Sequence, residues 1–157
     1  MNRALVARVA ELARTEGMRV LELYAGSGNL TLALAPGSES YTAVEQSPDA
    51  VLALRTNLAA RDLRVKVVES DVAKALAGGP VDVVVLDPPR TGAPSVLATL
   101  AQRKPKRVIY VSCDPATLGR DVAELLTRGY VVTWAEAFEM FPQTADLESV
   151  VQLERAP

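Results

Sequence analysis

Apolar residues follow two alternating spacings along the chain. Short, near-continuous apolar runs rich in β-branched residues are typical of strands, and they alternate with segments whose apolar residues recur at helical spacing. The runs predict seven strands, at residues 19–24, 41–44, 65–68, 81–86, 108–111, 130–137 and 149–153. The helical segments are 2–16, 29–35, 47–60, 94–103 and 115–127.

This alternation predicts an α/β fold in which a mostly parallel seven-stranded sheet has helices on both faces. The run at 81–86 is almost entirely apolar, as expected for a parallel strand buried on both sides. The last two strands have no helical segment between them, so we expect them to form a terminal hairpin. At 157 residues, 49% of them hydrophobic, the chain is expected to be a single domain spanning 1–157.

A glycine turn joins the first strand to the next helix, in the stretch Leu23-Tyr24-Ala25-Gly26-Ser27-Gly28-Asn29. Glycine at these two positions allows a tight turn and the close approach of a ligand, and the N–H groups of the helix that follows point toward it. A dinucleotide-binding turn would carry a third glycine where this chain has Thr31, which argues against a nicotinamide cofactor. A plain strand-to-helix turn is the alternative.

Acidic residues follow three of the predicted strands. Glu45 comes 17 positions after Gly28, close to the spacing of about 20 at which Rossmann-like folds place a carboxylate on ribose hydroxyls. Asp87 precedes two prolines, which forbid both ladder and helix, so its carboxylate is held at the C-terminal end of a central strand, where open sheets bind ligands. The plainer alternatives are a solvated strand end for Glu45, a helix cap for Asp71 and a strand terminator for Asp87.

The only cysteine lies between a strand and a helix. Cys113 follows the strand 108–111, and Pro115 is well placed to begin the helix 115–127. A position at a helix N-terminus favours the thiolate, an effect that the neighbouring Asp114 partly opposes. A buried, inert thiol is the alternative, because free cysteine is among the most buried residue types.

Composition excludes several kinds of site. Without histidine and with one cysteine, the chain is expected to have no disulfide and no metal. Its net charge of −2 disfavours independent nucleic-acid binding, and the basic run at 103–107 precedes a strand, so we expect a solvated loop away from the ligand edge. No apolar run has the length of a membrane span, and Glu11 and Glu16 lie where a signal peptide would be apolar; a cytoplasmic location is expected.

Four segments in this order resemble the RNA uridine-5 methyltransferases, class I S-adenosylmethionine-dependent enzymes that form 5-methyluridine in transfer or ribosomal RNA. The segments are the glycine turn at 23–29, Asp87-Pro88-Pro89-Arg90, the stretch 110–118 around Cys113, and Met140-Phe141-Pro142-Gln143-Thr144 followed by Leu147-Glu148. The resemblance covers nearly the whole chain. It implies a Rossmann-like class I methyltransferase fold, S-adenosylmethionine as cofactor and RNA as substrate.

The resemblance also implies roles for individual residues. The cofactor site is implied to contain Tyr24, Gly26, Gly28, Asn29, Glu45, Asp71 and Asp87, with Asp71 at the adenine edge. Cys113 is implied to be the nucleophile and Glu148 the base. Carbon 5 of uracil is a poor nucleophile, so a thiolate must first add to carbon 6, and a base must later remove the proton from carbon 5. In a chain without histidine a carboxylate is the obvious base, and partial burial would raise its pKa.

The chain departs from the family pattern at three points. Asp114 stands where the family usually has Asn, and Asp146 where it commonly has His, so both positions add negative charge. The family's N-terminal RNA-binding domain, with the segment whose Phe-x-Gln motif helps hold the cofactor, is expected to precede Asn2 and to be absent. RNA binding is therefore expected to need an additional domain or partner. Two alternatives stay open: a cofactor-binding module or subunit without independent catalysis, and a methyltransferase acting on a substrate other than RNA.

Overall fold

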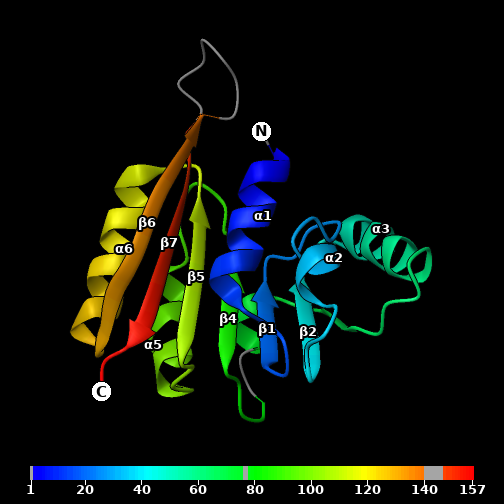
Figure 1. The fold of residues 1–157 in the computed structure, drawn as a ribbon, viewed down its shortest axis with the longest axis horizontal. Helices are drawn as coiled ribbons and strands as arrows, with labels where there is room; N and C mark the ends of the chain where they lie inside the picture. The colour runs from blue at the N-terminus through cyan, green and yellow to red at the C-terminus, as the bar shows by residue number, and fades with distance from the viewer. Residues whose placement is uncertain (1, 76–77, 140–146) are drawn as a thin grey trace.

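The computed structural model describes residues 2–75, 78–139 and 147–157. The strands are β1 (Arg19–Leu23), β2 (Ser40–Glu45), β3 (Lys66–Glu69), β4 (Val83–Leu86), β5 (Arg107–Ser112), β6 (Tyr130–Glu139) and β7 (Leu147–Arg155). The helices are α1 (Asn2–Ala13), α2 (Thr31–Leu34), α3 (Pro48–Ala59), α4 (Val72–Ala75), α5 (Pro94–Gln102) and α6 (Pro115–Thr127). Figure 1 shows these elements arranged around one sheet.

The strands lie in the order β3-β2-β1-β4-β5-β7-β6. The first five strands along the chain pair in parallel, whereas β7 is antiparallel to both β5 and β6. The predicted α/β fold, with its mostly parallel seven-stranded sheet and terminal hairpin, is therefore confirmed. The parallel strands have their C-terminal ends at one edge of the sheet, the edge toward which the arrowhead of β5 points in Figure 1.

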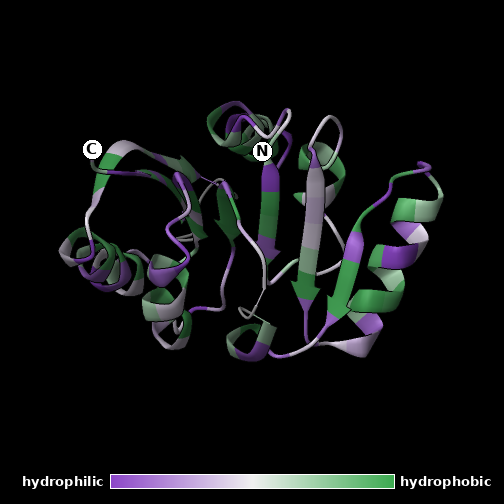
Figure 2. Cartoon of the chain, turned by 90° about the horizontal axis from the view of Figure 1, so that it is seen from below, coloured by the Kyte–Doolittle hydropathy of each residue, from purple (hydrophilic) through white to green (hydrophobic). Residues whose placement is uncertain are grey.

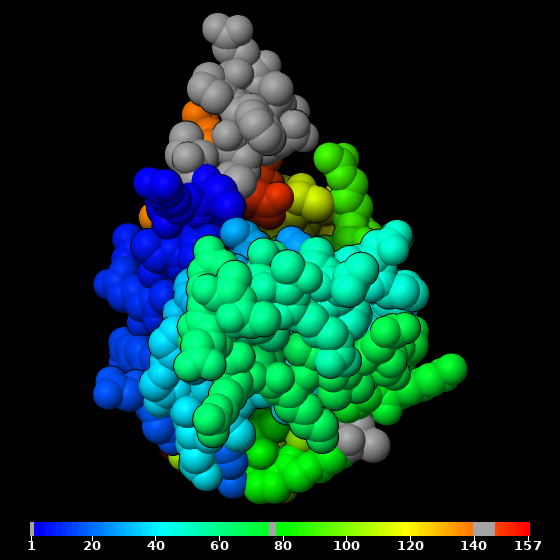
Figure 3. Space-filling model, turned by 90° about the vertical axis from the view of Figure 1, so that its right-hand side faces the viewer, coloured from blue at the N-terminus to red at the C-terminus, as the bar shows by residue number. Residues whose placement is uncertain are grey.

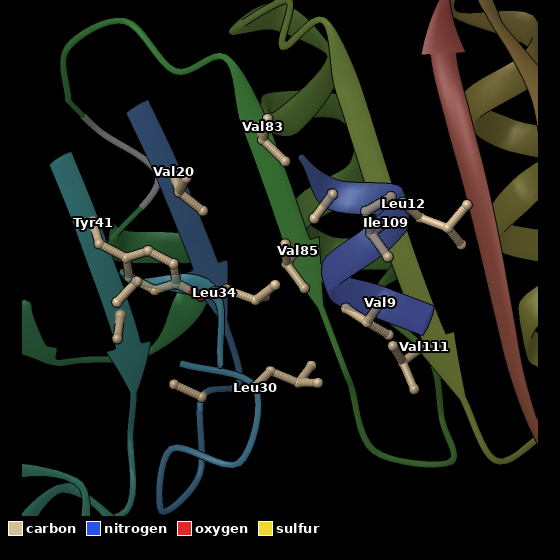
Figure 4. Close-up of a cluster of buried hydrophobic side chains, with 14 of the residues drawn as sticks. Val9, Leu12, Val20, Leu30, Leu34, Tyr41, Val83, Val85, Ile109 and Val111 are labelled. Carbon is tan, nitrogen blue, oxygen red and sulfur yellow. The ribbon is translucent and has the colours of Figure 1, made fainter. Parts of the chain in front are cut away.

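Buried apolar side chains form a core on each face of this sheet. α1, α2 and α3 cover one face, where Val9 and Leu12 of α1 lie over Ile109 of β5 (Figure 4). α4, α5 and α6 cover the other face, whose core includes Leu97 and Tyr110. In Figure 2 green, apolar stretches lie within the strands, several of which have purple ends, and the surrounding helices carry both polar and apolar positions. None of the helices in the described ranges is long and apolar enough to cross a membrane.

Two predicted helices have different boundaries in the structure, and one short helix is added. The first helix ends at Ala13, because Arg14 has a left-handed φ of 47°, and the positive φ of 66° at Gly17 belongs to the following turn. The helix expected at 29–35 is confined to Thr31–Leu34. The single turn Val72–Ala75 was anticipated only through the helix-cap alternative for Asp71, because four residues are too few to show a helical period.

The basic run at 103–107 lies at the N-terminal edge of the sheet, as predicted, but it is more than a solvated loop. The backbone N–H groups of Lys106 and Arg107 donate to the carbonyl of Asp82, at 2.8 and 3.2 Å. The guanidinium of Arg107 donates to the carbonyl of Ala13 at 2.8 Å and lies 3.3 Å from a carboxylate oxygen of Glu154. The run therefore fastens β5 to the start of β4, to α1 and to β7.

Candidate functional site

The glycine turn after β1 has the left-handed backbone that only glycine adopts freely. φ is 56° at Gly26 and 98° at Gly28. A Cβ at Gly28 would lie 2.6 Å from Cδ1 of Leu54, whereas nothing stands within 4 Å of a Cβ at Gly26. Tyr24 also has a positive φ, 62°, and such strain in a non-glycine residue clusters at ligand sites. The turn thus presents open backbone at Gly26.

Glu22, a buried residue of β1, holds the helix that follows this turn by a hydrogen bond. It is 2% exposed, and its Oε2 accepts hydrogen bonds from Thr31 Oγ1 at 2.5 Å and from Tyr41 Oη at 2.9 Å. Burial raises the pKa of Glu22 to about 7, against the opposing effect of the two hydrogen bonds. Thr31, which occupies the place of the third glycine of a dinucleotide turn, therefore binds the start of α2 to β1.

Glu45, at the end of β2, reaches the glycine turn. Its Oε2 accepts a hydrogen bond from the backbone N–H of Gly26 at 2.9 Å. Its Oε1 accepts from the N–H groups of Gln46 and Ser47, both at 2.8 Å. The structure thus brings Glu45 and Gly26 together, as a shared cofactor site requires, and the ribose-binding role stays a prediction.

Asp71 and Asn29 are both exposed, and both have hydrogen-bond partners in the chain. Asp71 Oδ1 accepts from the N–H of Ala73 at 2.9 Å, so this residue caps α4, as the alternative interpretation expected. The amide of Asn29 exchanges hydrogen bonds of 3.0 and 3.1 Å with that of Asn2 on α1. Their predicted roles toward a cofactor stay predictions, since neither arrangement excludes a ligand at the remaining polar atoms.

Asp87 directly follows β4 at the C-terminal edge of the sheet. The residue as a whole is exposed to solvent, but its carboxyl group is partly desolvated. This desolvation, together with the negative charge of Glu148, raises the pKa of Asp87 to about 7. Two carboxyl groups that the sequence separates by 61 positions therefore share one electrostatic environment.

The pairing of β5 with β7 brings Cys113 and Glu148 to the same end of one antiparallel ladder. The last pair of this ladder joins Ser112 to Ser149. Cys113 directly follows β5, and Glu148 lies on β7 one position beyond that last pair. Both residues are half-buried. The thiol is therefore not fully buried, and its role as the nucleophile stays a prediction.

Asp114 caps the helix that begins after Cys113. Its Oδ1 accepts a hydrogen bond from the N–H of Thr117 at 2.9 Å. Hydrogen bonds from the backbone of this helix turn, Thr117 first, lower the pKa of Asp114. The negative charge of Asp114, next to Cys113, is thus stabilised by the N-terminus of α6.

A buried network that sequence reasoning missed holds the loop after Asp87. Asp121 of α6 is fully buried, and its Oδ2 accepts hydrogen bonds from Tyr110 Oη at 2.6 Å and from the N–H of Ala93 at 2.7 Å. Arg120 bridges Asp121 Oδ1, at 2.7 Å, to the carbonyl of Thr91, at 2.9 Å. α6 therefore positions both Cys113 at its start and the loop that carries Asp87. A carboxylate on the apolar stripe Leu118–Leu125 was the available sign of this network.

Two predicted features lie outside the described residues: the segment Met140-Phe141-Pro142-Gln143-Thr144 and Asp146. In the part of the chain that the structure describes, no three histidine, cysteine, aspartate or glutamate side chains are grouped as metal ligands would be.

Comparison with known proteins assigns the chain to a family. A family model described as conserved hypothetical protein 95 matches residues 7–125. The chain belongs to this family.

The 23S rRNA (uracil(1939)-C(5))-methyltransferase RlmD of Alkalilimnicola ehrlichii is 42% identical over 163 residues, a match that covers 99% of the chain and 37% of that relative. The RlmD of Chromohalobacter salexigens is 45% identical over 139 residues, covering 87% and 29%. The chain thus spans about a third of the length of these relatives, and its resemblance to RNA uridine-5 methyltransferases is confirmed.

Solved structures place the fold. The tRNA (uracil-54, C5)-methyltransferase of Pyrococcus abyssi, in complex with S-adenosyl-L-homocysteine, superposes with a TM-score of 0.86 at 31% identity, over 97% of this chain and 38% of that one. TrmN of Thermus thermophilus gives a TM-score of 0.77 at 24% identity, over 96% and 48%, a likeness of fold alone. The predicted Rossmann-like class I methyltransferase fold is confirmed.

Proposed function

We propose that the chain is a catalytic domain of the RNA uridine-5 methyltransferase type, which transfers a methyl group from S-adenosylmethionine to carbon 5 of a uridine in ribosomal or transfer RNA. The observation that carries this proposal is the placement of Cys113 and Glu148 at the same end of the ladder between β5 and β7. The relatives named as uracil-C5 methyltransferases support the reaction class. Residues 1–157 are taken as one such domain.

The C-terminal edge of the sheet suits S-adenosylmethionine. Its backbone is open at Gly26, and the Glu45 carboxylate lies beside that glycine, where ribose hydroxyls would be held. We assign the remaining cofactor contacts to Tyr24, Gly28, Asn29, Asp71 and Asp87. When bound, the cofactor supplies an electrophilic methyl group on a positively charged sulfur. Two carboxyl groups, Asp87 and Glu148, share this edge, and their negative charge favours a cation there.

The reaction needs two groups of this chain in sequence. The Cys113 thiolate adds to carbon 6 of the uracil, and the electron pair of the C5–C6 double bond moves into the ring carbonyl, which makes carbon 5 nucleophilic. After carbon 5 has taken the methyl group, Glu148 accepts the proton from carbon 5. The C5–C6 double bond then re-forms, the C6–S bond breaks and the thiolate of Cys113 leaves.

RNA containing 5-fluorouridine tests the covalent step. Fluorine at carbon 5 cannot leave as a proton, so Cys113 should stay bound and the adduct should survive denaturing electrophoresis. Cys113→Ala should lose both adduct and methyl transfer, whereas Glu148→Gln should accumulate an adduct on ordinary uridine RNA. Near-normal turnover by Cys113→Ala would refute the covalent mechanism.

Tight RNA binding is proposed to need a further domain or a partner, because the net charge of −2 opposes contact with phosphates. Methyl incorporation at low salt and high RNA concentration tests the isolated chain. Binding of S-adenosylhomocysteine by calorimetry without turnover on any RNA would instead favour a cofactor-binding module. Methylation with no RNA present would favour another substrate class.

A further inference from the structure

The sheet face on the side of α4, α5 and α6 is not completely covered. In a parallel sheet both faces are normally packed by helices, but α4 is a single turn of four residues. Beside it a hollow of about 340 Å³ remains, with side chains of Leu21, Thr42 and Val68 among its lining. In Figure 3 it opens near the lower end of the face shown, between the cyan-to-teal segments of β2 and β3 and the green segment around α4.

Four cationic side chains from separate elements surround this hollow, and none of the described residues that line it is acidic. They are Arg19 of β1, Lys66 of β3, Lys74 of α4 and Arg103 after α5. Such a concentration of positive charge is unexpected in a chain whose net charge is −2. We define these four residues and the hollow between them as the basic hollow.

The four cations are not equally available. Arg19 is held by Asp82, with Nε 2.7 Å from the carboxylate. Arg103 donates a hydrogen bond to the carbonyl of Gly79, and burial lowers the pKa of Arg103. Lys66 and Lys74 are exposed, and the described residues provide neither with an ion pair within 4.0 Å. The basic hollow therefore keeps at least two lysine charges for a ligand.

We propose that the basic hollow binds phosphate groups in the backbone of an RNA strand. This inference rests on the proposed function, and it names where an acidic domain contacts RNA. The exposed lysines stand at the rim, which suits a strand that crosses the opening, and the hydroxyls of Ser40 and Ser70 line the same space. The hollow lies against β1, β2 and β3, whereas Cys113 follows β5, so the contacted phosphates are those of nucleotides outside the reacting uridine.

A matched pair of double variants tests the proposal. Lys66→Gln with Lys74→Gln removes two charges at the basic hollow, and Arg55→Gln with Arg61→Gln removes two exposed charges on and after α3. Binding of a uridine-containing single-stranded RNA is measured by fluorescence anisotropy across a range of salt concentrations. The lysine variant should bind about tenfold more weakly at about 50 mM salt, and its log–log salt slope should fall by about 1.4, since each lost contact to a single strand removes about 0.7.

The arginine variant should stay within about twofold of the wild type. Equal losses in the two variants, or no measurable RNA binding by the wild type at low salt, would overturn the proposal. Amide NMR shifts provide a second measurement: RNA should move the resonances of Lys66, Ser70 and Lys74. If pyrophosphate moves them and RNA does not, the hollow is a small-anion site and the RNA proposal fails.

Calorimetry with S-adenosylhomocysteine on the same proteins keeps the two proposals distinguishable. Both double variants should bind it as the wild type does, because none of the four changed residues is assigned to the cofactor. Failure of the wild type to bind it would refute the proposed function, while the RNA measurements would still decide the basic hollow.

Discussion

Two aspartates flank β4, and their surroundings shift their pKa values in opposite directions. Asp82, before the strand, accepts hydrogen bonds from Arg19 at 2.7 and 3.0 Å and lies 3.2 Å from Lys106 Nζ, and these cations hold its pKa well below the ordinary range. Asp87, after the strand, has its pKa raised to about 7 by desolvation and by Glu148. The four residues of β4 thus separate a carboxylate whose ionised form is stabilised by cations from one whose ionised form is destabilised.

The difference separates structural from functional use of the same side chain. At the N-terminal end of β4, Asp82 joins elements of the fold, and its charge is paired with Arg19 and Lys106. The C-terminal edge is where open α/β sheets bind ligands, and there the negative charge of Glu148 helps to raise the pKa of Asp87. A cationic methyl donor would favour the ionised form of Asp87, which is the reason we propose that it binds at this edge.

The largest expected effect comes from the same substitution made at the two ends of β4. Asp87→Asn should lower methyl transfer about a hundredfold, as loss of one group that stabilises developing or bound charge commonly does. Asp82→Asn, the matched control, should leave the rate per folded molecule within about twofold, because its partners lie at the opposite edge. Single-turnover methylation with labelled cofactor measures both. Equal rates in the two variants would contradict a role of Asp87 in methyl transfer that Asp82 lacks.

A third carboxylate sharpens the comparison, because Asp121 is fully buried and paired yet serves the ligand edge. Asp121→Asn weakens the contacts to Arg120 and Ala93 that hold the loop after Asp87. We expect a loss of about 2.5 kcal/mol in the free energy of unfolding, since charged hydrogen bonds in buried sites contribute about 1.5–3 kcal/mol each. Urea denaturation measures it. Arg128→Gln, which removes an exposed pair with Glu124 on the same helix, is the control and should cost under about 0.5 kcal/mol.

Asp82→Asn should cost less than Asp121→Asn, about 1.5 kcal/mol in the free energy of unfolding. The carboxylate is 8% exposed, but Arg19 is 37% exposed and Lys106 74%, so solvent screens the pairs. Its lowered pKa adds a pH signature: the stabilisation is present above about pH 4 and is lost as pH falls toward the native-state pKa. Thermal melts of wild type and variant at pH 7 and pH 3 should therefore converge at the lower pH. A difference that persists undiminished at pH 3 would contradict the ion-pair explanation.

The sequence alone predicted those features of the two ends of β4 that depend on neighbouring residues. Buried strands show as apolar runs, so β4 and its neighbours were placed to within about two residues, and the two prolines after Asp87 marked a fixed carboxylate at a strand end. Pro115 likewise predicted that Cys113 precedes a helix. These features depend on residues close together in the chain, which local patterns can encode.

The remaining features depend on pairings between distant residues. The placement of Cys113 and Glu148 at one end of a ladder follows from the antiparallel register of β5 and β7, which no local pattern specifies, and only the family resemblance implied it. Asp82 pairs with Arg19 across 63 positions, and Asp121 reaches Ala93 across 28. No spacing rule relates such partners. The sequence shows how many charged residues there are, but it does not show which of them form pairs.

The smallest expected effect is a gain in stability from removing the destabilised carboxylate. Because the pKa of Asp87 is raised in the native state, the native chain binds more protons than the unfolded chain between about pH 4 and pH 7, and the wild type loses stability as pH rises through that window. Asp87→Asn does not titrate there, so it should equal the wild type near pH 4 and exceed it by about 1 kcal/mol at pH 8, a modest value because solvent reaches the carboxylate. Glu22 titrates in the same direction, with a pKa of about 7 that is raised chiefly by burial and also by the charge of Asp87, so the loss of that charge in the variant adds to the gain. Denaturation of the two proteins at pH 4, 6 and 8 measures the gain. A variant that is no more stable than the wild type at pH 8 would show that Asp87 carries no electrostatic strain, and the two ends of β4 would then differ only in their partners.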